Sequence, residues 1–208
     1  MRLILASTSP RRRQILALLG VRFEVIAPAF EEAPSPERSI EDEVQQFALA
    51  KAKSVATDQP QSIVIGSDTM IYLSGEKIGK PGGIEDAKRL LRFLAGKRHR
   101  ICTGVALVDG TGGPGLAVVE EVDVKMRDYS EEEIDRYLAR NESLDKAGAY
   151  SIQGEGRALI ESMQGDYLAA VGLPLRPIAA YLESRGMTLP SDVDRLYSEK
   201  SFLNWQSF

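Results

Sequence analysis

The chain has 208 residues, 43% of them hydrophobic and 27% charged, and its formal net charge is −4. This length suits one large α/β domain or two small ones, and the acidic balance argues against a broad basic surface for nucleic acid. No apolar run reaches the roughly 18 residues that a membrane span needs. The N-terminus becomes arginine-rich too early for a secretory signal. We therefore expect a cytoplasmic protein that binds neither nucleic acid nor a membrane.

The cysteine and histidine content limits the kinds of metal site that the chain can form. Cys102 is the single cysteine and His99 the single histidine, which excludes an intrachain disulfide, a cysteine-based zinc site and an all-histidine metal cluster. Any metal must be held mainly by carboxylates, which favours Mg²⁺ or Mn²⁺. Because nothing near His99 in the sequence pairs with it, we expect it to be hydrogen-bonded or exposed rather than catalytic.

The most informative stretch lies at the start of the chain. Residues 3–6 are apolar and predict a buried strand, a Ser-Thr-Ser loop follows, and residues 10–19 predict a helix. Ser9 suits the N-cap and Pro10 the first helical position. Helix N-termini attract anions, and the three arginines after Pro10 add forked donors that match phosphate oxygens. Two interpretations stay open: a polyphosphate-binding site, or a solvated arginine face.

The next elements carry two further candidate residues. The sequence predicts a short strand at 23–26, a loop rich in Pro and Glu at 28–39, and a helix at 40–57. Glu32 lies in the loop and Lys51 on the helix. Acidic residues in such a loop are usually solvated and a helical lysine is usually a surface residue. Neither residue points to a function by itself.

Asp68 differs from these because it interrupts an apolar strand. Residues 62–73 predict one long strand with Ser-Asp-Thr at its centre, followed by a hairpin turn at 74–76. A carboxylate in that position is costly to bury without a partner. A buried salt bridge or a satisfied turn would explain it structurally, and a catalytic or metal-binding role would explain it functionally. Lys80 follows the hairpin.

The rest of the chain alternates helices and strands. We predict helices at 84–94, 130–138 and 174–184, strands at 98–108, 116–126, 159–163 and 167–171, and turns at 109–115 and 164–166. The stretch 144–154 is rich in small residues, so we expect another group to approach its backbone closely. We place the domain at 1–188 and a polar C-terminal tail at 189–208. For the tail two alternatives stay open, disorder or packing on a partner subunit.

Several of these stretches together resemble one protein family, the Maf nucleotide pyrophosphatases, over about residues 2 to 185. The blocks that carry the resemblance are Leu-Ala-Ser-Thr-Ser-Pro-Arg-Arg at 5–12, the segment 48–52, Gly-Ser-Asp-Thr at 66–69, Gly-Lys-Pro at 79–81, the segment 144–154 and Val-Gly-Leu-Pro at 171–174. The resemblance implies an α/β fold of the Maf and ITPase type. In this fold helices flank a long, twisted mixed sheet, and two lobes surround a cleft. It also implies a homodimer.

The resemblance further implies an activity and a base preference. The family hydrolyses nucleoside triphosphates to the monophosphate and pyrophosphate with a divalent metal. Asp-Thr at 68–69 and Ile-Gln-Gly at 152–154 resemble the branch that acts on dTTP and UTP, with modified pyrimidine triphosphates as further possible substrates. Two alternatives are a 7-methyl-GTP pyrophosphatase of the same family and a non-catalytic, nucleotide-binding regulator of cell division.

Residue roles follow from the resemblance together with side-chain chemistry. Asp68 is expected to be the catalytic residue, positioning water and metal, and nearby lysines are expected to lower its pKa. Glu32 and Asp68 are the expected ligands of Mg²⁺ or Mn²⁺. The expected substrate-binding residues are Ser7, Arg11, Arg12, Lys51 and Lys80. Base specificity is expected from Arg11, Thr69 and Gln153, because a glutamine amide can donate and accept at once, as a pyrimidine edge requires.

Overall fold

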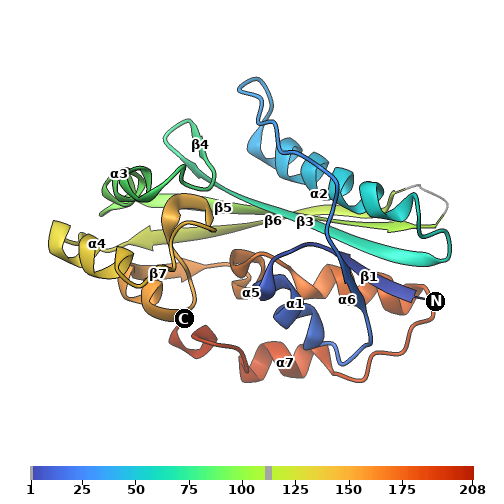
Figure 1. Ribbon diagram of the computed structural model, residues 1–208. Coiled ribbons are helices and arrows are strands. Elements are labelled where there is room, and N and C mark those ends of the chain that lie inside the picture. Colours follow the sequence, from blue (N-terminus) through green and yellow to red (C-terminus); the bar gives the residue numbers. More distant parts are fainter. Residues whose placement is uncertain (1, 111–113) are drawn as a thin grey trace.

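A mixed β-sheet forms the centre of the molecule, with helices on both of its faces (Figure 1). The computed structural model describes residues 2–110 and 114–208. Its strands are β1 (Arg2–Ala6), β2 (Glu24–Ile26), β3 (Ser62–Leu73), β4 (Glu76–Ile78), β5 (Arg98–Asp109), β6 (Pro114–Met126) and β7 (Ile160–Gln164). Its helices are α1 (Pro10–Ala17), α2 (Ile40–Ala56), α3 (Ile84–Leu94), α4 (Glu131–Leu138), α5 (Tyr167–Val171), α6 (Leu175–Ser184) and α7 (Val193–Glu199), with 3-10 turns η1 (Ala147–Ala149), η2 (Gly154–Leu159) and η3 (Trp205–Ser207).

The strand order within the described residues is β2-β1-β3-β5-β6-β7, with β4 paired to β3. β1 runs parallel to β2 and β3, and the remaining neighbours are antiparallel. The long strands β3, β5 and β6 make up the body of the sheet. The predicted α/β fold with a long mixed sheet is confirmed. The centre of the predicted turn at 109–115, residues 111–113, lies outside the described residues.

The two faces of β1 explain how the layers pack. Ile4 and Ala6 point to one face and contact the apolar side of α2. Leu3 and Leu5 point to the other face, into the main core that α1, α5 and α6 share. In Figure 1, α2 lies on one side of the sheet and α1, α5 and α6 lie on the other. This is the alternation expected of a strand that is buried on both faces.

Two glycines let α2 lie directly on the sheet. A Cβ atom added to Gly66 in β3 would lie 2.2 Å from the backbone oxygen of Ala48. One added to Gly104 in β5 would lie 2.3 Å from the backbone oxygen of Val44. Any side chain at these positions would push the helix away, so the close approach depends on glycine. It brings the middle of α2 to the part of β3 that carries Asp68.

The prediction of a strand at 167–171 was wrong, because this segment is the helix α5. The carboxylate of Asp166 caps it, accepting the N–H groups of Leu168 (2.8 Å) and Ala169 (3.3 Å). A short apolar run fits a buried helix as well as a strand, and the cap decides between them. The predicted turn at 164–166 therefore joins β7 to a helix and not to a second strand.

The C-terminal segment, residues 189–208, has regular secondary structure. It forms α7 and η3 and packs on the same chain, where Trp205 is buried against Tyr167. Scattered aromatic residues in a polar tail can fold in this way only where the domain offers an apolar surface, which a local sequence pattern does not reveal. Among the described residues, no helix is long and apolar enough to cross a membrane.

Candidate active site

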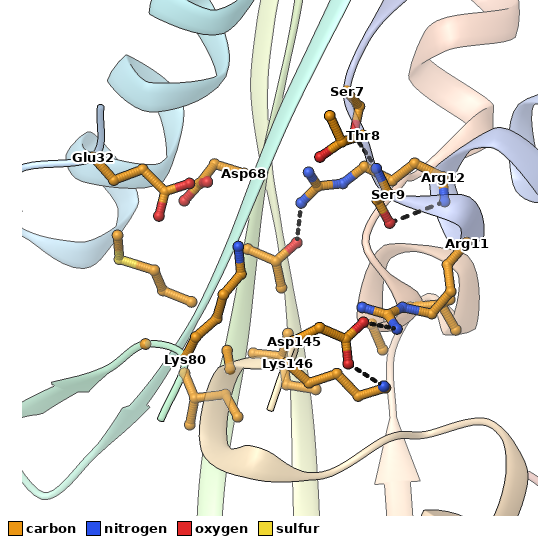
Figure 2. A pocket seen from close by; sticks show the side chains of 18 of the residues that line it. Ser7, Thr8, Ser9, Arg11, Arg12, Glu32, Asp68, Lys80, Asp145 and Lys146 are labelled. Carbon is orange, nitrogen blue, oxygen red and sulfur yellow. Dashed lines mark hydrogen bonds and ion pairs between the residues drawn. The ribbon is translucent and has the colours of Figure 1, made fainter. Parts of the chain in front are cut away.

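A cavity of about 740 Å³ opens among the end of β1, the start of α1, the middle of α2 and β3, and the segment 145–153. It is lined by every residue that the sequence predicts for the site: Ser7, Arg11, Arg12, Glu32, Lys51, Asp68, Thr69, Lys80 and Gln153. Figure 2 shows the carboxylates of Glu32 and Asp68 on one side and the loop before α1 on the other. The structure thus brings together residues that are far apart in the chain.

The loop after β1 has the geometry predicted for an anion site. Ser9 is the N-cap of α1 and its hydroxyl accepts the N–H of Arg12 at 3.4 Å, while Pro10 occupies the first helical position. The hydroxyl of Ser7 accepts the N–H of Ser9 at 3.1 Å. The N-terminus of α1 therefore faces the cavity, where its dipole and N–H groups favour negative charge.

The two arginines of this helix are held differently. Arg12 donates from Nε to the backbone oxygen of Gly172 (2.9 Å) and from Nη2 to the hydroxyl of Thr69 (3.2 Å). Arg11 forms an ion pair with Asp145 at 3.0 Å, at the open rim of the cavity (Figure 2). Arg12 is thus fixed deep in the site, whereas the partner of Arg11 is largely exposed.

A charged triad occupies the opposite wall. Nζ of Lys51 lies 2.5 Å from Oδ1 of Asp68 and 2.6 Å from Oε1 of Glu32. Only 4% of Asp68 and 8% of Lys51 are exposed, so this pair is shielded from water. Lys51 and Asp68 meet because α2 lies directly on β3 at Gly66. A buried salt bridge and a functional site were alternative explanations of Asp68 in the sequence, and the structure places the salt bridge inside the cavity.

The carboxylates of the triad differ in acidity. Burial raises the pKa of Asp68, and this outweighs the opposing charges of Lys51 and Arg12. Lys51 does act to lower the pKa of Asp68, as predicted, but the net direction is the opposite, because the sequence does not show how completely the group is desolvated. Burial also acts to raise the pKa of Glu32, but the hydrogen bond and charge of Lys51 prevail and hold that pKa below its usual range.

The donor set fits a hard divalent cation. Oδ2 of Asp68 is buried and has no hydrogen-bond partner among the described residues, which normally costs free energy unless a ligand completes the site. Glu32 is less buried and lies on the same wall. Mg²⁺ uses one or two carboxylates together with phosphate oxygens and water, and these two side chains provide that number.

Gln153 lines the cavity from the stretch of small residues. It is 7% exposed, and its Nε2 has no partner among the described residues. Its backbone N–H donates to the hydroxyl of Ser151 (3.2 Å), whose own N–H donates to the hydroxyl of Tyr137 in α4 (3.0 Å). The glutamine is thus anchored through its backbone, which leaves the side-chain nitrogen for a ligand. His99 is hydrogen-bonded to Tyr150 (2.7 Å), as expected.

Sequence reasoning missed a second group of charged residues that shape the cavity. Lys77 donates to the carboxylate of Glu43 (2.7 Å) and to the backbone oxygen of Ser35 (2.6 Å), and Glu43 is fully buried. This ion pair ties the loop that carries Glu32 to α2 and the β3–β4 hairpin. Nothing in the sequence marked Lys77, whereas Asp145 lay within the small-residue stretch already singled out.

Comparison with known proteins decides the family. The chain matches the family profile described as Maf-like protein over residues 2–185. The chain belongs to the Maf family. Within that family it is 46% identical over 188 residues to a dTTP/UTP pyrophosphatase from Dictyoglomus thermophilum, covering 90% of this chain and 97% of the relative. It is 41% identical over 184 residues to a dTTP/UTP pyrophosphatase from Bacillus cereus, covering 88% and 94%.

The fold of this Maf-family chain also occurs in solved structures. The Ham1 protein of Staphylococcus aureus superimposes with a TM-score of 0.51 and 16% sequence identity, covering 89% of this chain and all of that one. At this identity the likeness concerns the fold alone. The Maf match ends at residue 185, so the C-terminal segment lies outside it.

Proposed function

We propose that the protein hydrolyses dTTP and UTP to the nucleoside monophosphate and pyrophosphate, and so removes pyrimidine triphosphates from the nucleotide pool. The observation that carries the proposal is one cavity that arginines and lysines line together with Asp68, whose Oδ2 has no hydrogen-bond partner among the described residues. The names of relatives that are 41% and 46% identical support the substrate class. Modified pyrimidine triphosphates are further substrates to be tested.

The cationic groups of the cavity suit a triphosphate. The N-terminus of α1 and the hydroxyl of Ser7 lie on one side, with Arg11 and Arg12 beside them. Lys51 and Lys80 reach the cavity from the opposite side. A triphosphate placed between the two sides gains charge-assisted hydrogen bonds from both, and these offset the negative charge that develops on the leaving pyrophosphate.

Glu32 and Asp68 are proposed to hold Mg²⁺ or Mn²⁺ together with phosphate oxygens. When bound, such an ion polarises the phosphoryl group and neutralises charge. Lys51 lies between the two carboxylates and keeps both in place.

Asp68 is proposed to orient the attacking water and accept its proton. The water oxygen bonds to the α-phosphorus, and the bond between that phosphorus and the α–β bridging oxygen breaks. The bridging oxygen and its electron pair leave with pyrophosphate. Oδ1 of Asp68 is held by Lys51 and Oδ2 has no partner within the part of the chain that the structure describes, so Oδ2 is the atom available to the water.

Base selection is assigned to the side of the cavity that carries Gln153. Its Nε2, which has no partner among the described residues, can donate to a pyrimidine carbonyl, and an amide oxygen can accept from the ring N–H. Thr69 is hydrogen-bonded to Arg12 and Thr103, so its proposed effect on specificity is to fix the wall near the substrate. Arg11 is proposed to contribute from the rim, where Asp145 holds it.

The cellular setting is proposed from the resemblance and the charge. The family resemblance implies the homodimer, a net charge of −4 argues against a nucleic-acid partner, and a cytoplasmic protein without a membrane partner suits substrates that are dissolved in the cytoplasm. Sedimentation equilibrium of the purified chain measures the oligomer, and a single monomeric species contradicts the dimer.

Product identification tests the proposed reaction. The purified protein is incubated with Mg²⁺ and each of dTTP, UTP, ATP, GTP and 7-methyl-GTP, and ³¹P NMR follows the products. We expect pyrophosphate and nucleoside monophosphate, formed fastest from dTTP and UTP. Release of inorganic phosphate contradicts the proposed bond cleavage. Preference for 7-methyl-GTP assigns the chain to that activity, and tight nucleotide binding without any turnover supports a non-catalytic regulator.

A further inference from the structure

The C-terminal segment packs against one wall of the cavity. Trp205 is 5% exposed, and its ring stacks on Tyr167 with the centroids 5.5 Å apart. Tyr197 meets the same indole ring edge-on at 5.0 Å. Tyr167 is the first residue of α5, and Ala170 and Val171 of that helix line the cavity. The segment is therefore joined firmly to a helix of the site, although it lies outside the Maf match.

The same segment also holds the turn that follows Gln153. The N–H of Gly154 donates to Oδ1 of Asn204 at 3.3 Å, and Nδ2 of Asn204 donates to the backbone oxygen of Gly154 at 3.5 Å. Three residues further, Arg157 donates to the backbone oxygen of Ser207 at 2.9 Å and lies 4.2 Å from the ring centroid of Phe208. The first turn of η2 is thus tied to the segment at two points.

These contacts matter for Gln153 because its side-chain nitrogen has no partner among the described residues. Its position is set by the backbone on either side, where Ser151 binds its N–H and Asn204 binds the next residue, Gly154. Gly154 has φ +65°, which residues with a side chain seldom adopt, so the turn is a tight one. A small shift of this turn moves the amide that would meet the base.

We propose that the C-terminal segment fixes the Gln153 turn relative to α5, and that Asn204 is a positioning residue for base discrimination. The inference rests on the proposed function, because it assigns base selection to Gln153. Asn204 acts through the backbone of Gly154 and does not line the cavity. Discrimination by hydrogen bonds requires the donor and acceptor to be held in place before the base arrives, and the segment supplies that constraint.

Substitution of Asn204 in the full chain tests this. Asn204 has φ +63°, so Asn204→Gly removes the amide while keeping the backbone conformation accessible. Asn204→Asp keeps an acceptor for the N–H of Gly154 and also tolerates this conformation. Gln206→Ala is the matched control, because the hydrogen bond of Gln206 among the described residues stays within the segment, to the backbone oxygen of Glu199 at 3.4 Å.

Two quantities are measured for each variant: the ratio of kcat/KM for dTTP to that for ATP, and the hydrogen-exchange rate of the Gly154 amide. For Asn204→Gly we expect exchange to rise by about tenfold and the ratio to fall by about threefold to tenfold, the effect of one lost hydrogen bond. Asn204→Asp should recover most of both values, and Gln206→Ala should change neither. A general loss of stability lowers kcat/KM for both substrates alike and leaves the ratio unchanged.

The outcomes separate this inference from the proposed function. An Asn204→Gly variant with the wild-type ratio overturns the inference, whether or not exchange accelerates. Unchanged exchange at Gly154 also overturns it. A wild-type protein that does not prefer dTTP contradicts the proposed function instead, and the exchange rates then still decide whether the segment holds the turn.

Discussion

Replacing Asp68 with asparagine distinguishes the role of this side chain in catalysis from its role in the stability of the fold. The new amide oxygen can still accept the hydrogen bond that Lys51 now gives to Oδ1 at 2.5 Å. The amide NH₂ then takes the place of Oδ2, the buried oxygen that no described residue contacts by a hydrogen bond. Shape and packing are kept, but the lone pairs and negative charge that would orient water are lost at that position.

The expected magnitudes differ sharply for rate and stability. Loss of a general base typically costs roughly 10²–10⁴ in rate, so kcat for dTTP should fall by at least about a hundredfold. The buried ion pair becomes a hydrogen bond from the charged Lys51 to a neutral amide, and Glu32 still neutralises Lys51, so the unfolding free energy should fall by about 1–3 kcal/mol. Affinity for dTTP should stay within about tenfold, because the arginines and lysines are intact.

Steady-state kinetics, calorimetric binding of dTTP and denaturant unfolding measure these three quantities. Asp123→Asn is the matched control, because Asp123 is an exposed acid on the neighbouring part of the sheet and does not line the cavity. It should change none of them. An Asp68→Asn variant with near-normal kcat would refute the assigned role of Asp68 and leave its burial beside Lys51 as a structural feature.

Three further predictions follow from the same geometry. Excess chelator should stop hydrolysis and added Mg²⁺ or Mn²⁺ should restore it, because the site offers oxygen ligands; full activity in chelator contradicts this. Lys80→Ala should lower kcat/KM by a similar factor for all triphosphates, whereas Gln153→Ala should lower it mainly for dTTP and UTP, by ~1–3 kcal/mol; equal losses for every substrate would make Gln153 structural. Burial lowers the pKa of His99 to about 4, so the unfolded chain binds this proton more readily. The stability that neutral His99 contributes is complete above about pH 6.5 and is lost as the pH falls toward 4, by ~2 kcal/mol at pH 5. Unfolding of wild type and His99→Gln at pH 8 and pH 5 checks this, and equal pH dependence in both would contradict it.

Local sequence patterns were sufficient to predict those parts of the fold that depend on residues close together in the chain. The strand, loop and helix at 3–19 could be predicted because Ser9 and Pro10 mark the helix start and the apolar run marks the strand. Asp68 could be singled out because a carboxylate within an apolar strand needs an explanation. These signals are present in the sequence itself and do not depend on tertiary contacts.

The remaining features depend on contacts between distant segments. In the sequence, Lys51 cannot be distinguished from a surface lysine. Its burial depends on the close contact between α2 and β3 that Gly66 permits. The segment 167–171 fits a strand by composition, but in the fold it is a helix that Asp166 caps. Burial of Trp205 against Tyr167 joins residues that are far apart in the chain. The direction of the Asp68 pKa likewise depends on how deeply the folded chain encloses it.

The measurement that tests the central claim most directly is kcat/KM of the wild-type protein for dTTP, UTP, ATP, GTP and 7-methyl-GTP under one set of conditions with Mg²⁺. The bond cleaved is the same in all five, so differences must come from contacts to the base. The account predicts dTTP and UTP as the best substrates, each releasing pyrophosphate. A purine triphosphate as the best substrate, or equal values for all five, would contradict it.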